Sequence, residues 1–459
     1  MMSLQQAQRW IPGSRLQGDG NTVLASVSTD SRSLKDGELF IALKGERFDA
    51  HNFLTDTTLQ QRAAAVVAEH LPSGFNKPAL LVDNTLHALG ALAAGWRSQF
   101  TLPVIAVTGS NGKTTVKEMI AAILAAHCGE AQRLATQGNF NNEIGVPLTL
   151  FRMNAQHRAA VIELGMNHIG EIDTLAKITQ ATVALVNNAQ REHQEFMQSV
   201  AAVARENGNV ISALGPDGIA VFPADEEHTP IWRELAGARR VIDFAQHSTA
   251  AVTGYGHAVP GGTQLKMFTP QGDLECLLPA QGEHNVRNAL AATACALAAD
   301  VPLAAIRAGL SAFQPAPGRL QFKRSTQGVT VIDDTYNANP DSVRAAIDVL
   351  AAAPTLRVLV LGDMGEVGDQ GPQFHREIGA YARSKGIDVL LATGPLMRDA
   401  VATCGGQAQH FEQIEDLIAC VQPLVQPGMT VLIKGSRFMR MERVVQTLLG
   451  ETNPTKETH

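Results

Sequence analysis

The sequence predicts an α/β protein of three domains: a small α/β N-terminal domain, a central phosphate-loop domain with a mostly parallel sheet, and a Rossmann-like C-terminal domain. Three observations predict this organisation. The chain has 459 residues, and a domain takes about 150. An apolar strand at 104–108 runs into a glycine-rich loop and then a helix. A segment with two prolines and a glycine, at 314–318, breaks the helical pattern.

The N-terminal domain is expected over residues 1–83. Short apolar runs of strand length alternate there with polar loops, and they lie at 39–43, 64–68 and 79–82. Runs of this length, separated by polar residues, indicate a small α/β unit.

The central domain is expected over residues 84–312. Its predicted strands are continuously apolar and alternate with helical stretches; they lie at 104–108, 159–162 and 182–186. Parallel strands are buried on both faces, so this pattern predicts a sheet with helices on each side. The stretch at 250–278 differs and predicts inserted hairpins.

The C-terminal domain is expected over residues 313–459. Predicted strands again alternate with helices, and they lie at 328–333, 356–361, 387–392 and 429–433. This alternation is typical of a Rossmann-like fold.

Composition narrows the function classes. Lys and Arg number 37 against 44 Asp and Glu, the net charge is −7, and no block of like charge occurs. A protein that binds nucleic acid or an anionic membrane would carry a basic patch, so we expect neither partner.

No apolar run approaches the roughly 18 residues of a membrane span, and the first residues lack a signal-peptide pattern. Five scattered cysteines without a CxxC pair indicate reduced thiols, so we expect a cytoplasmic protein, and a monomer.

The clearest local signal is a phosphate loop between the strand at 104–108 and a helix; its residues are Gly109, Ser110, Asn111, Gly112, Lys113, Thr114 and Thr115. Glycines let backbone N–H groups approach a phosphate, and the helix N-terminus favours negative charge. Lys113 would reach the outer phosphates, and the Thr114 hydroxyl would bind a nucleotide-bound Mg²⁺.

The match to the GxxxxGK[ST] pattern is incomplete, because its first glycine would fall at Val107. A glycine-rich turn with an incidental lysine is the alternative. The strand and helix on either side favour a nucleotide site. Without a guanine-reading NKxD sequence, we expect ATP rather than GTP.

Two further polar residues follow predicted strands. Glu163 ends the strand at 159–162, and His193 follows the strand at 182–186. At neighbouring strand ends, a carboxylate and an imidazole could hold a second cation beside the triphosphate. Each also has an ordinary alternative: Glu163 as a helix cap or salt-bridge partner, and His193 as a structural residue.

Several motifs, in order along nearly the whole chain, resemble the Mur ligases. They are TGSNGKTTVKEM, GNFNNEIGVPLTL, VIELGMNHIGEI, NNAQREH, HNVRNALAATACAL, VIDDTYNANPDS, LGDMGEVG and VLIKGSR. Within that family, VSTDSR at 27–32 is shared by the third and fourth ligases of the series. DDTYNANPDS at 333–342, with LGDMGEVG, is similar to the last of them, which joins D-alanyl-D-alanine to UDP-N-acetylmuramoyl-tripeptide. The resemblance implies an ATP- and Mg²⁺-dependent ligase of peptidoglycan precursor synthesis, a cell-wall process linked to cell shape and division.

Three alternatives remain open at this point. A diamino-acid-adding Mur ligase is one, although the DNPR motif of those enzymes is absent. A folylpolyglutamate synthase-like ligase is another, although it should lack the VSTDSR region. The third is a non-catalytic relative that binds a UDP-peptide.

The resemblance also implies roles for residues around the nucleotide. Lys113 and the loop amides would bind the β- and γ-phosphates, Thr114 and Glu163 would ligate Mg²⁺, and His193 would help to hold a second Mg²⁺. Asn288 would touch the adenine. Arg319 would reach the phosphates, or could be a surface residue of the linker. From the third domain, Asp334 and a turn would face the nucleotide and the closing cleft; the turn consists of Tyr336, Asn337, Ala338 and Asn339.

The N-terminal domain would hold the UDP moiety, by the same resemblance. The expected residues are Thr29, Ser31, Arg32, Lys44 and Gly45. An ordinary strand–turn pair is the alternative for Ser31 and Arg32.

The implied reaction activates a carboxylate. ATP would phosphorylate the terminal carboxylate of the UDP-linked tripeptide, and the amine of D-alanyl-D-alanine would attack the acyl phosphate. Two anions must meet, so Lys113, Arg319 and Mg²⁺ must screen the γ-phosphate from the carboxylate. The expected catalytic residues are Lys113, Glu163, His193 and Arg319, of which Glu163 and His193 would act by holding metal.

One position departs from the family pattern. Mur ligases commonly carry a carbamylated lysine, whose carboxylate supports the second Mg²⁺, and the spacing from His193 places it at Asn207. Asparagine cannot be carbamylated. Either Glu206 or Glu195 supplies the charge, or Asn207 offers only a neutral oxygen. We expect a second Mg²⁺ with altered ligands.

Overall fold

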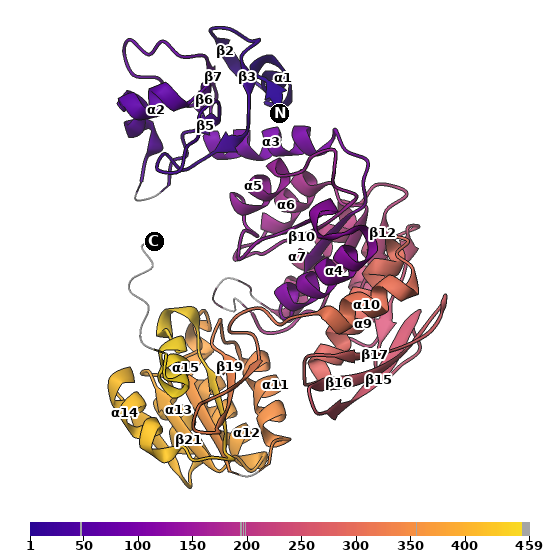
Figure 1. The fold of residues 1–459 in the computed structure, drawn as a ribbon, viewed down its shortest axis with the longest axis vertical. Coiled ribbons are helices and arrows are strands. Elements are labelled where there is room, and N and C mark those ends of the chain that lie inside the picture. Colours follow the sequence, from indigo (N-terminus) through magenta and orange to yellow (C-terminus); the bar gives the residue numbers. More distant parts are fainter. Residues whose placement is uncertain (46–47, 193–194, 196, 198, 355, 452–459) are drawn as a thin grey trace.

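The computed structural model describes residues 1–45, 48–192, 195, 197, 199–354 and 356–451. It is an α/β fold with mostly parallel sheets, which confirms the expected fold class. Figure 1 shows three lobes: the start of the chain forms one end, the middle forms the centre, and the last part forms the other end. In the part of the chain that is described, no helix is long and apolar enough to cross a bilayer.

The N-terminal lobe contains a five-stranded sheet in which only the first strand is antiparallel. The strand order is β2 (Arg15–Gln17), β7 (Ala79–Leu81), β6 (Ala65–Ala68), β5 (Leu39–Ile41) and β4 (Val27–Ser28). The accompanying elements are β1 (Met2–Ser3), β3 (Val23–Leu24), α1 (Leu4–Trp10), the 3₁₀ helix η1 (Ala50–Thr55) and α2 (Thr57–Arg62). The apolar runs read from the sequence coincide with β5, β6 and β7.

The central lobe is built on a six-stranded, fully parallel sheet. The strand order is β13 (Arg240–Val241), β12 (Ile219–Val221), β11 (Val183–Val186), β8 (Val104–Thr108), β10 (Ala159–Glu163) and β9 (Arg133–Ala135). The helices of this lobe are α3 (Thr85–Arg97), α4 (Lys113–Cys128), α5 (Gly145–Phe151), α6 (Glu171–Thr179), α7 (Val200–Ser212), α8 (Thr229–Ala236), α9 (Glu283–Ala298) and α10 (Leu303–Ala312), with the 3₁₀ helix η2 (Glu130–Gln132).

Strand β8 lies inside this sheet and is buried on both faces. Val104 and Ala106 belong to a core shared with α3, α5, α6 and α7. Ile105 and Val107 belong to a second core, shared with α4, α9 and α10. Successive side chains of a strand point to opposite faces, so the continuous apolar run fills both cores.

A second sheet extends the central lobe beside α9 and α10. Its order is β14 (Phe244–Ala245), β15 (Val252–Val259), β16 (Gly262–Thr269) and β17 (Gly272–Leu278). The last three strands form two antiparallel hairpins, as the sequence predicts for 250–278.

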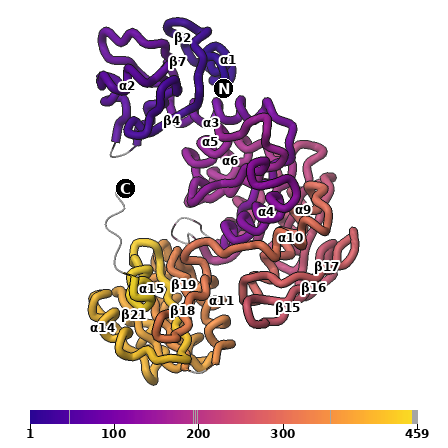
Figure 2. The backbone as a smooth tube through the Cα atoms, viewed as in Figure 1, coloured from indigo at the N-terminus to yellow at the C-terminus, as the bar shows by residue number. Residues whose placement is uncertain are grey.

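The C-terminal lobe contains a six-stranded sheet with one antiparallel edge strand. Its order is β18 (Gln321–Arg324), β19 (Thr330–Asp334), β23 (Thr430–Lys434), β20 (Arg357–Gly362), β21 (Val389–Thr393) and β22 (Ala408–Phe411). The other elements are α11 (Pro340–Ala351), η3 (Gly368–Gln370), α12 (Gly371–Ser384), α13 (Met397–Cys404), α14 (Ile414–Leu424), η4 (Arg437–Met439) and α15 (Glu442–Leu449). Four predicted strands lie within about two residues of β19, β20, β21 and β23. The tube in Figure 2 follows the chain from the central lobe into this one.

Helix α10 packs unusually close to α4. A Cβ atom added at Gly309 would lie 2.3 Å from the Cα of Ile123, so the two helix backbones touch where the side chain is absent. Helix α4 begins at Lys113 of the predicted phosphate loop, so this contact helps to fix the helix that follows the loop.

We expect Gly309→Ala to lower the free energy of unfolding by roughly 2 kcal/mol. The added methyl group overpacks the contact between α10 and α4, which costs about 1–3 kcal/mol. Alanine also favours a helix more than glycine does, but this gain is below about 1 kcal/mol, so the cost is larger. Urea unfolding followed by circular dichroism measures the change. Ser311→Ala, on an exposed position of the same helix, is the control, and equal stability of the two variants would contradict the prediction.

Candidate active site

The predicted phosphate loop connects β8 to α4. Strand β8 lies between β10 and β11, so the carboxyl ends of three parallel strands meet at the loop. Gly109 and Gly112 have φ angles of 130° and 80°, which residues with side chains rarely adopt. A Cβ atom at Gly112 would also lie 2.6 Å from Asn288 Oδ1. The shape of the loop therefore requires both glycines.

The segment that follows β11 holds this loop through hydrogen bonds. The backbone N–H of Asn111 donates to Asn188 Oδ1 at 2.8 Å, and the N–H of Gln190 donates to Ser110 Oγ at 2.8 Å. Asn187 Nδ2 donates to the Asn111 carbonyl at 2.8 Å. The loop is thus held in one conformation by groups of the protein itself.

Lys113 is the first residue of α4, and its ammonium group folds back on the loop. Nζ donates to the carbonyls of Gly109 and, at 3.2 Å, Ser110. It also forms an ion pair at 3.3 Å with Glu192 Oε2. Together with the N-terminus of α4, Lys113 makes this end of the sheet attractive to an anion.

Glu163 lies at the end of β10 and is 2% exposed. Its Oε1 accepts hydrogen bonds from Thr114 Oγ1 at 3.1 Å and from Asn141 Nδ2 at 2.8 Å. Its backbone N–H donates to Thr136 Oγ1 at 2.9 Å. The structure therefore brings together two of the three residues expected to bind a metal, Thr114 and Glu163.

This arrangement fits Mg²⁺. Glu163 Oε2 is buried, and no described residue offers it a hydrogen bond. The Thr114 hydroxyl lies beside the same carboxylate, so the donors are hard oxygens. Within the described ranges, no three His, Cys, Asp or Glu residues gather into a metal-binding group. A cation would thus take its other ligands from phosphate and water. The third expected ligand, His193, lies outside the described residues.

The C-terminal lobe touches the phosphate loop. Asn339, which caps α11, donates through Nδ2 to Asn111 Oδ1 at 2.9 Å. Arg191 forms ion pairs across the same junction, at 2.6 Å with Asp341 and at 3.0 Å with Glu377. The phosphate loop is therefore a meeting point of two lobes.

The expected residues of the C-terminal lobe lie near this junction. Arg319 stacks on the ring of Tyr336, with 4.0 Å between its Cζ and the ring centroid. Lys434 Nζ contacts Asp334 Oδ2 at 2.6 Å and donates to the Asn337 carbonyl at 2.9 Å. Each expected position is thus held by a specific neighbour, and none of these contacts reaches Lys113 directly.

Asn288 lies against the phosphate loop. Its Oδ1 accepts from Asn187 Nδ2 at 3.1 Å, and its Nδ2 donates to Asn285 Oδ1 at 3.1 Å. With Gly112 beside it, this side chain fixes the loop from the α9 side.

The five expected residues of the N-terminal lobe form two groups. Thr29, Ser31 and Arg32 follow β4, and Lys44 and Gly45 follow β5. These two strands are parallel neighbours, so both groups lie at the same edge of the sheet. Ligands of open α/β sheets bind at such an edge.

Arg32 is engaged locally. Its guanidinium donates to both carboxylate oxygens of Asp30, at 3.0 and 2.9 Å. These hydrogen bonds lower the pKa of the Asp30 carboxyl. The Arg32 side chain is 77% exposed, and an exposed pair of this kind contributes little stability.

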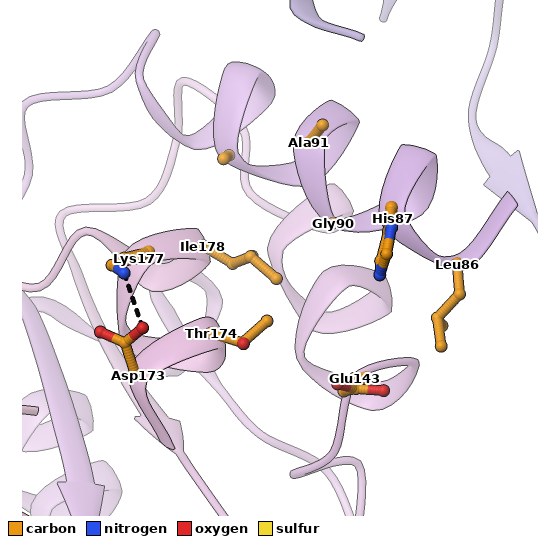
Figure 3. Close-up of a pocket in the computed structure, with 10 residues that line it drawn as sticks. Leu86, His87, Gly90, Ala91, Glu143, Asp173, Thr174, Lys177 and Ile178 are labelled. Atoms are coloured by element: carbon orange, nitrogen blue, oxygen red, sulfur yellow. Dashed lines mark hydrogen bonds and ion pairs between the residues drawn. The ribbon is translucent and has the colours of Figure 1, made fainter. Parts of the chain in front are cut away.

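A separate pocket of about 280 Å³ lies between α3 and α6. Figure 3 shows its wall, where Lys177 pairs with Asp173 at 2.6 Å and Ile178 approaches Gly90. Its lining includes no phosphate-loop residue. The pocket is therefore not the anion site.

Sequence reasoning missed Glu192, which immediately precedes His193 in NNAQREH. Its position directly before a candidate metal ligand is the one signal that could have identified it.

Comparison with known proteins identifies the family. Residues 107–296 match the Mur ligase middle domain, and residues 318–437 match the Mur ligase glutamate ligase domain. The UDP-N-acetylmuramoyl-tripeptide–D-alanyl-D-alanine ligase of Escherichia coli (strain K12) is 42% identical over 438 residues, which cover 94% of this chain and 95% of that protein. The chain belongs to the Mur ligase family.

Solved Mur ligase structures share the whole fold. Crystal structure I of MurF from Acinetobacter baumannii superposes with a TM-score of 0.92 at 36% identity, and covers 98% of both chains. The MurF ligase from Thermotoga maritima, solved in complex with ADP, gives a TM-score of 0.83 at 25% identity, over 94% of this chain and 98% of that one.

Glu226 supports the segment that holds the phosphate loop. Its Oε2 accepts from the Ala189 N–H at 3.2 Å, and its Oε1 accepts from Arg287 at 3.0 Å. Burial raises the pKa of this carboxyl from 4.5 to about 7, although Arg287 acts in the opposite direction.

We therefore expect stability to fall as pH rises from 5 to 8. The folded protein holds the Glu226 proton more tightly than the unfolded chain, so the stabilisation present at low pH is lost as pH passes through the folded pKa. Relative to Glu226→Gln, wild type should lose about 2 kcal/mol of unfolding free energy over this range. Urea unfolding at each pH measures the free energy of unfolding of both proteins. If the two free energies changed in parallel with pH, the prediction would be contradicted.

Proposed function

We propose that this chain is an ATP-dependent ligase that joins D-alanyl-D-alanine to UDP-N-acetylmuramoyl-tripeptide, releasing ADP and phosphate, in peptidoglycan precursor synthesis. One observation carries the proposal: Thr114, next to Lys113 at the start of α4, forms a buried pair with Glu163 at the end of β10. The identity with ligases of this name over 94% of the chain supports these two substrates.

ATP would bind with its phosphates at the start of α4. The first backbone N–H groups of α4 and the positive end of the helix dipole favour negative charge there. The N–H groups of Gly109, Ser110 and Asn111 already donate to Asn207 and Asn188. Lys113 would exchange its contacts with the Gly109 and Ser110 carbonyls for contacts with phosphate oxygens. Because the loop is already held by its neighbours, little ordering is needed when ATP binds.

Mg²⁺, when bound, would be held by Thr114 Oγ1 and the Glu163 carboxylate, and would neutralise charge on the transferred phosphoryl group. Glu163 remains correctly placed because Asn141 Nδ2 fixes one of its oxygens. Its second oxygen is left to face a cation.

The chemistry then requires positioning more than covalent work by the protein. The terminal carboxylate of the tripeptide attacks the γ-phosphorus, ADP leaves, and the amine of D-alanyl-D-alanine attacks the acyl phosphate carbon. The amine loses a proton, and inorganic phosphate leaves as the amide bond forms. Water would hydrolyse the acyl phosphate, so the site must exclude it.

The C-terminal lobe would provide this closure. Arg319, held against Tyr336, lies just beyond the linker and would bring positive charge to the phosphates. Asp334 and Asn337 are both fixed by Lys434 and would form part of the nucleotide-facing wall.

At the opposite end, the N-terminal lobe would bind the UDP moiety through the two groups of residues that follow β4 and β5. Exposed Lys44 and Arg32 suit its diphosphate, which carries negative charge.

Phosphate release from ATP tests this function. Release should require UDP-N-acetylmuramoyl-tripeptide and D-alanyl-D-alanine together, because only the pair completes the reaction. A coupled phosphate assay with each substrate omitted in turn measures it. Release that instead depends on a UDP-dipeptide and a free diamino acid would identify the diamino-acid-adding activity, and no release at all would indicate a binding protein.

Glu163→Gln tests the metal-facing carboxylate. The amide keeps an oxygen for Thr114 and Asn141 but loses the charge, so kcat/KM should fall by at least about 100-fold. A steady-state assay over a range of Mg²⁺ concentrations measures this. Glu130→Gln, with a side chain that is 75% exposed, should behave as wild type. Unchanged activity of Glu163→Gln would remove this residue from the site.

A further inference from the structure

A second buried carboxylate lies at the phosphate loop. Glu192 is 5% exposed, and its Oε2 lies 3.3 Å from Lys113 Nζ. Its other oxygen, Oε1, lies 3.5 Å from Asn207 Nδ2. Glu192 therefore reaches the loop from the segment after β11, whereas Glu163 reaches it from β10.

The orientation of the Asn207 side chain is determined by its partners. Oδ1 accepts from the Gly109 N–H at 3.0 Å and from Thr108 Oγ1 at 2.5 Å, and Nδ2 donates to the Val203 carbonyl at 3.1 Å. A backbone N–H can only donate and a carbonyl can only accept, so the amide cannot be reversed. The oxygen of Asn207 is thus occupied by the loop, and its NH₂ group faces Glu192.

The carboxylates considered from the sequence lie elsewhere. Glu206 is buried, but its Oε1 accepts from the Ile172 N–H and its Oε2 accepts from Asn209 Nδ2, both at 3.0 Å. It therefore binds the start of α6. Glu195 is exposed. Of the two, Glu206 is therefore engaged elsewhere and Glu195 is not a buried carboxylate.

A buried carboxylate beside a triphosphate is unfavourable unless a cation lies with it. In the structure Lys113 supplies that charge. Once Lys113 turns to the phosphates, this ion pair weakens, and the desolvated Glu192 would repel the phosphate oxygens. A divalent cation between the carboxylate and the phosphates would relieve the repulsion.

We propose that Glu192 is the carboxylate ligand of a second Mg²⁺ in the ATP-bound enzyme, with Asn207 holding it in place. The inference rests on the proposed function, because it requires ATP at the loop. Asn207 cannot form a carbamate, and Glu192 provides the negative charge permanently. The second metal site therefore does not depend on dissolved carbon dioxide.

Metal counting tests the proposal without turnover. Free Mn²⁺ is measured by electron paramagnetic resonance while the full-length protein is titrated with a non-hydrolysable ATP analogue present. Wild type should bind two Mn²⁺ ions. In Glu192→Gln the weaker ion should be lost, with its dissociation constant raised more than about tenfold, while the first ion and the nucleotide still bind. The control is Glu130→Gln, whose side chain is 75% exposed, and this variant should bind two ions.

The outcomes separate this inference from the proposed function. Two ions with unchanged affinity in Glu192→Gln would overturn the inference, as would a single ion in wild type with the nucleotide bound. Failure of wild type to bind the nucleotide at all would overturn the proposed function itself.

Removal of carbon dioxide provides a second test on the wild-type protein alone. Two Mn²⁺ ions should bind equally well in degassed buffer and in buffer with added bicarbonate. A second site that appears only with bicarbonate would show that a carbamate supplies the ligand, and would overturn the role of Glu192.

Discussion

The hydrogen bonds between the segment after β11 and the phosphate loop determine the geometry of the whole site. Asn188 and Gln190 fix the loop from one side, and Asn288 lies against Gly112 from the other. Because these groups set the loop conformation, they also set the direction of α4 and the place of Thr114 beside Glu163. The glycines are needed since no side chain fits between the loop and its supports.

Charge is distributed to suit anionic substrates. The chain is acidic, with a net charge of −7, yet the loop combines Lys113 with the N-terminus of α4. The carboxylates that approach this point come from the ends of two different strands flanking β8, and each is held by an amide side chain, Asn141 for Glu163 and Asn207 for Glu192. The site therefore places fixed negative charge where cations rather than phosphates are expected.

Much of the fold could be predicted from the sequence, because a continuous apolar run indicates a buried strand and a glycine-rich segment indicates a loop, and both depend only on neighbouring residues. The Thr114–Glu163 contact could also be anticipated, since parallel strands bring their carboxyl ends to one edge. The carboxylate beside Asn207 could not. Glu206 and Asn207 are adjacent on one helix but point about 100° apart, so only the packing of α7 shows that Glu206 binds α6 while Asn207 faces the loop.

Arg191 has a consequence for communication between lobes. It directly follows Gln190, whose N–H holds Ser110, and its guanidinium holds Asp341 and Glu377 of the C-terminal lobe. One short segment thus contacts both the loop and the C-terminal lobe. If nucleotide binding changes the Arg191 contacts, the orientation of that lobe is linked to occupancy of the loop, and such linkage is reciprocal. A substrate that stabilises these contacts would then strengthen nucleotide binding without touching the nucleotide.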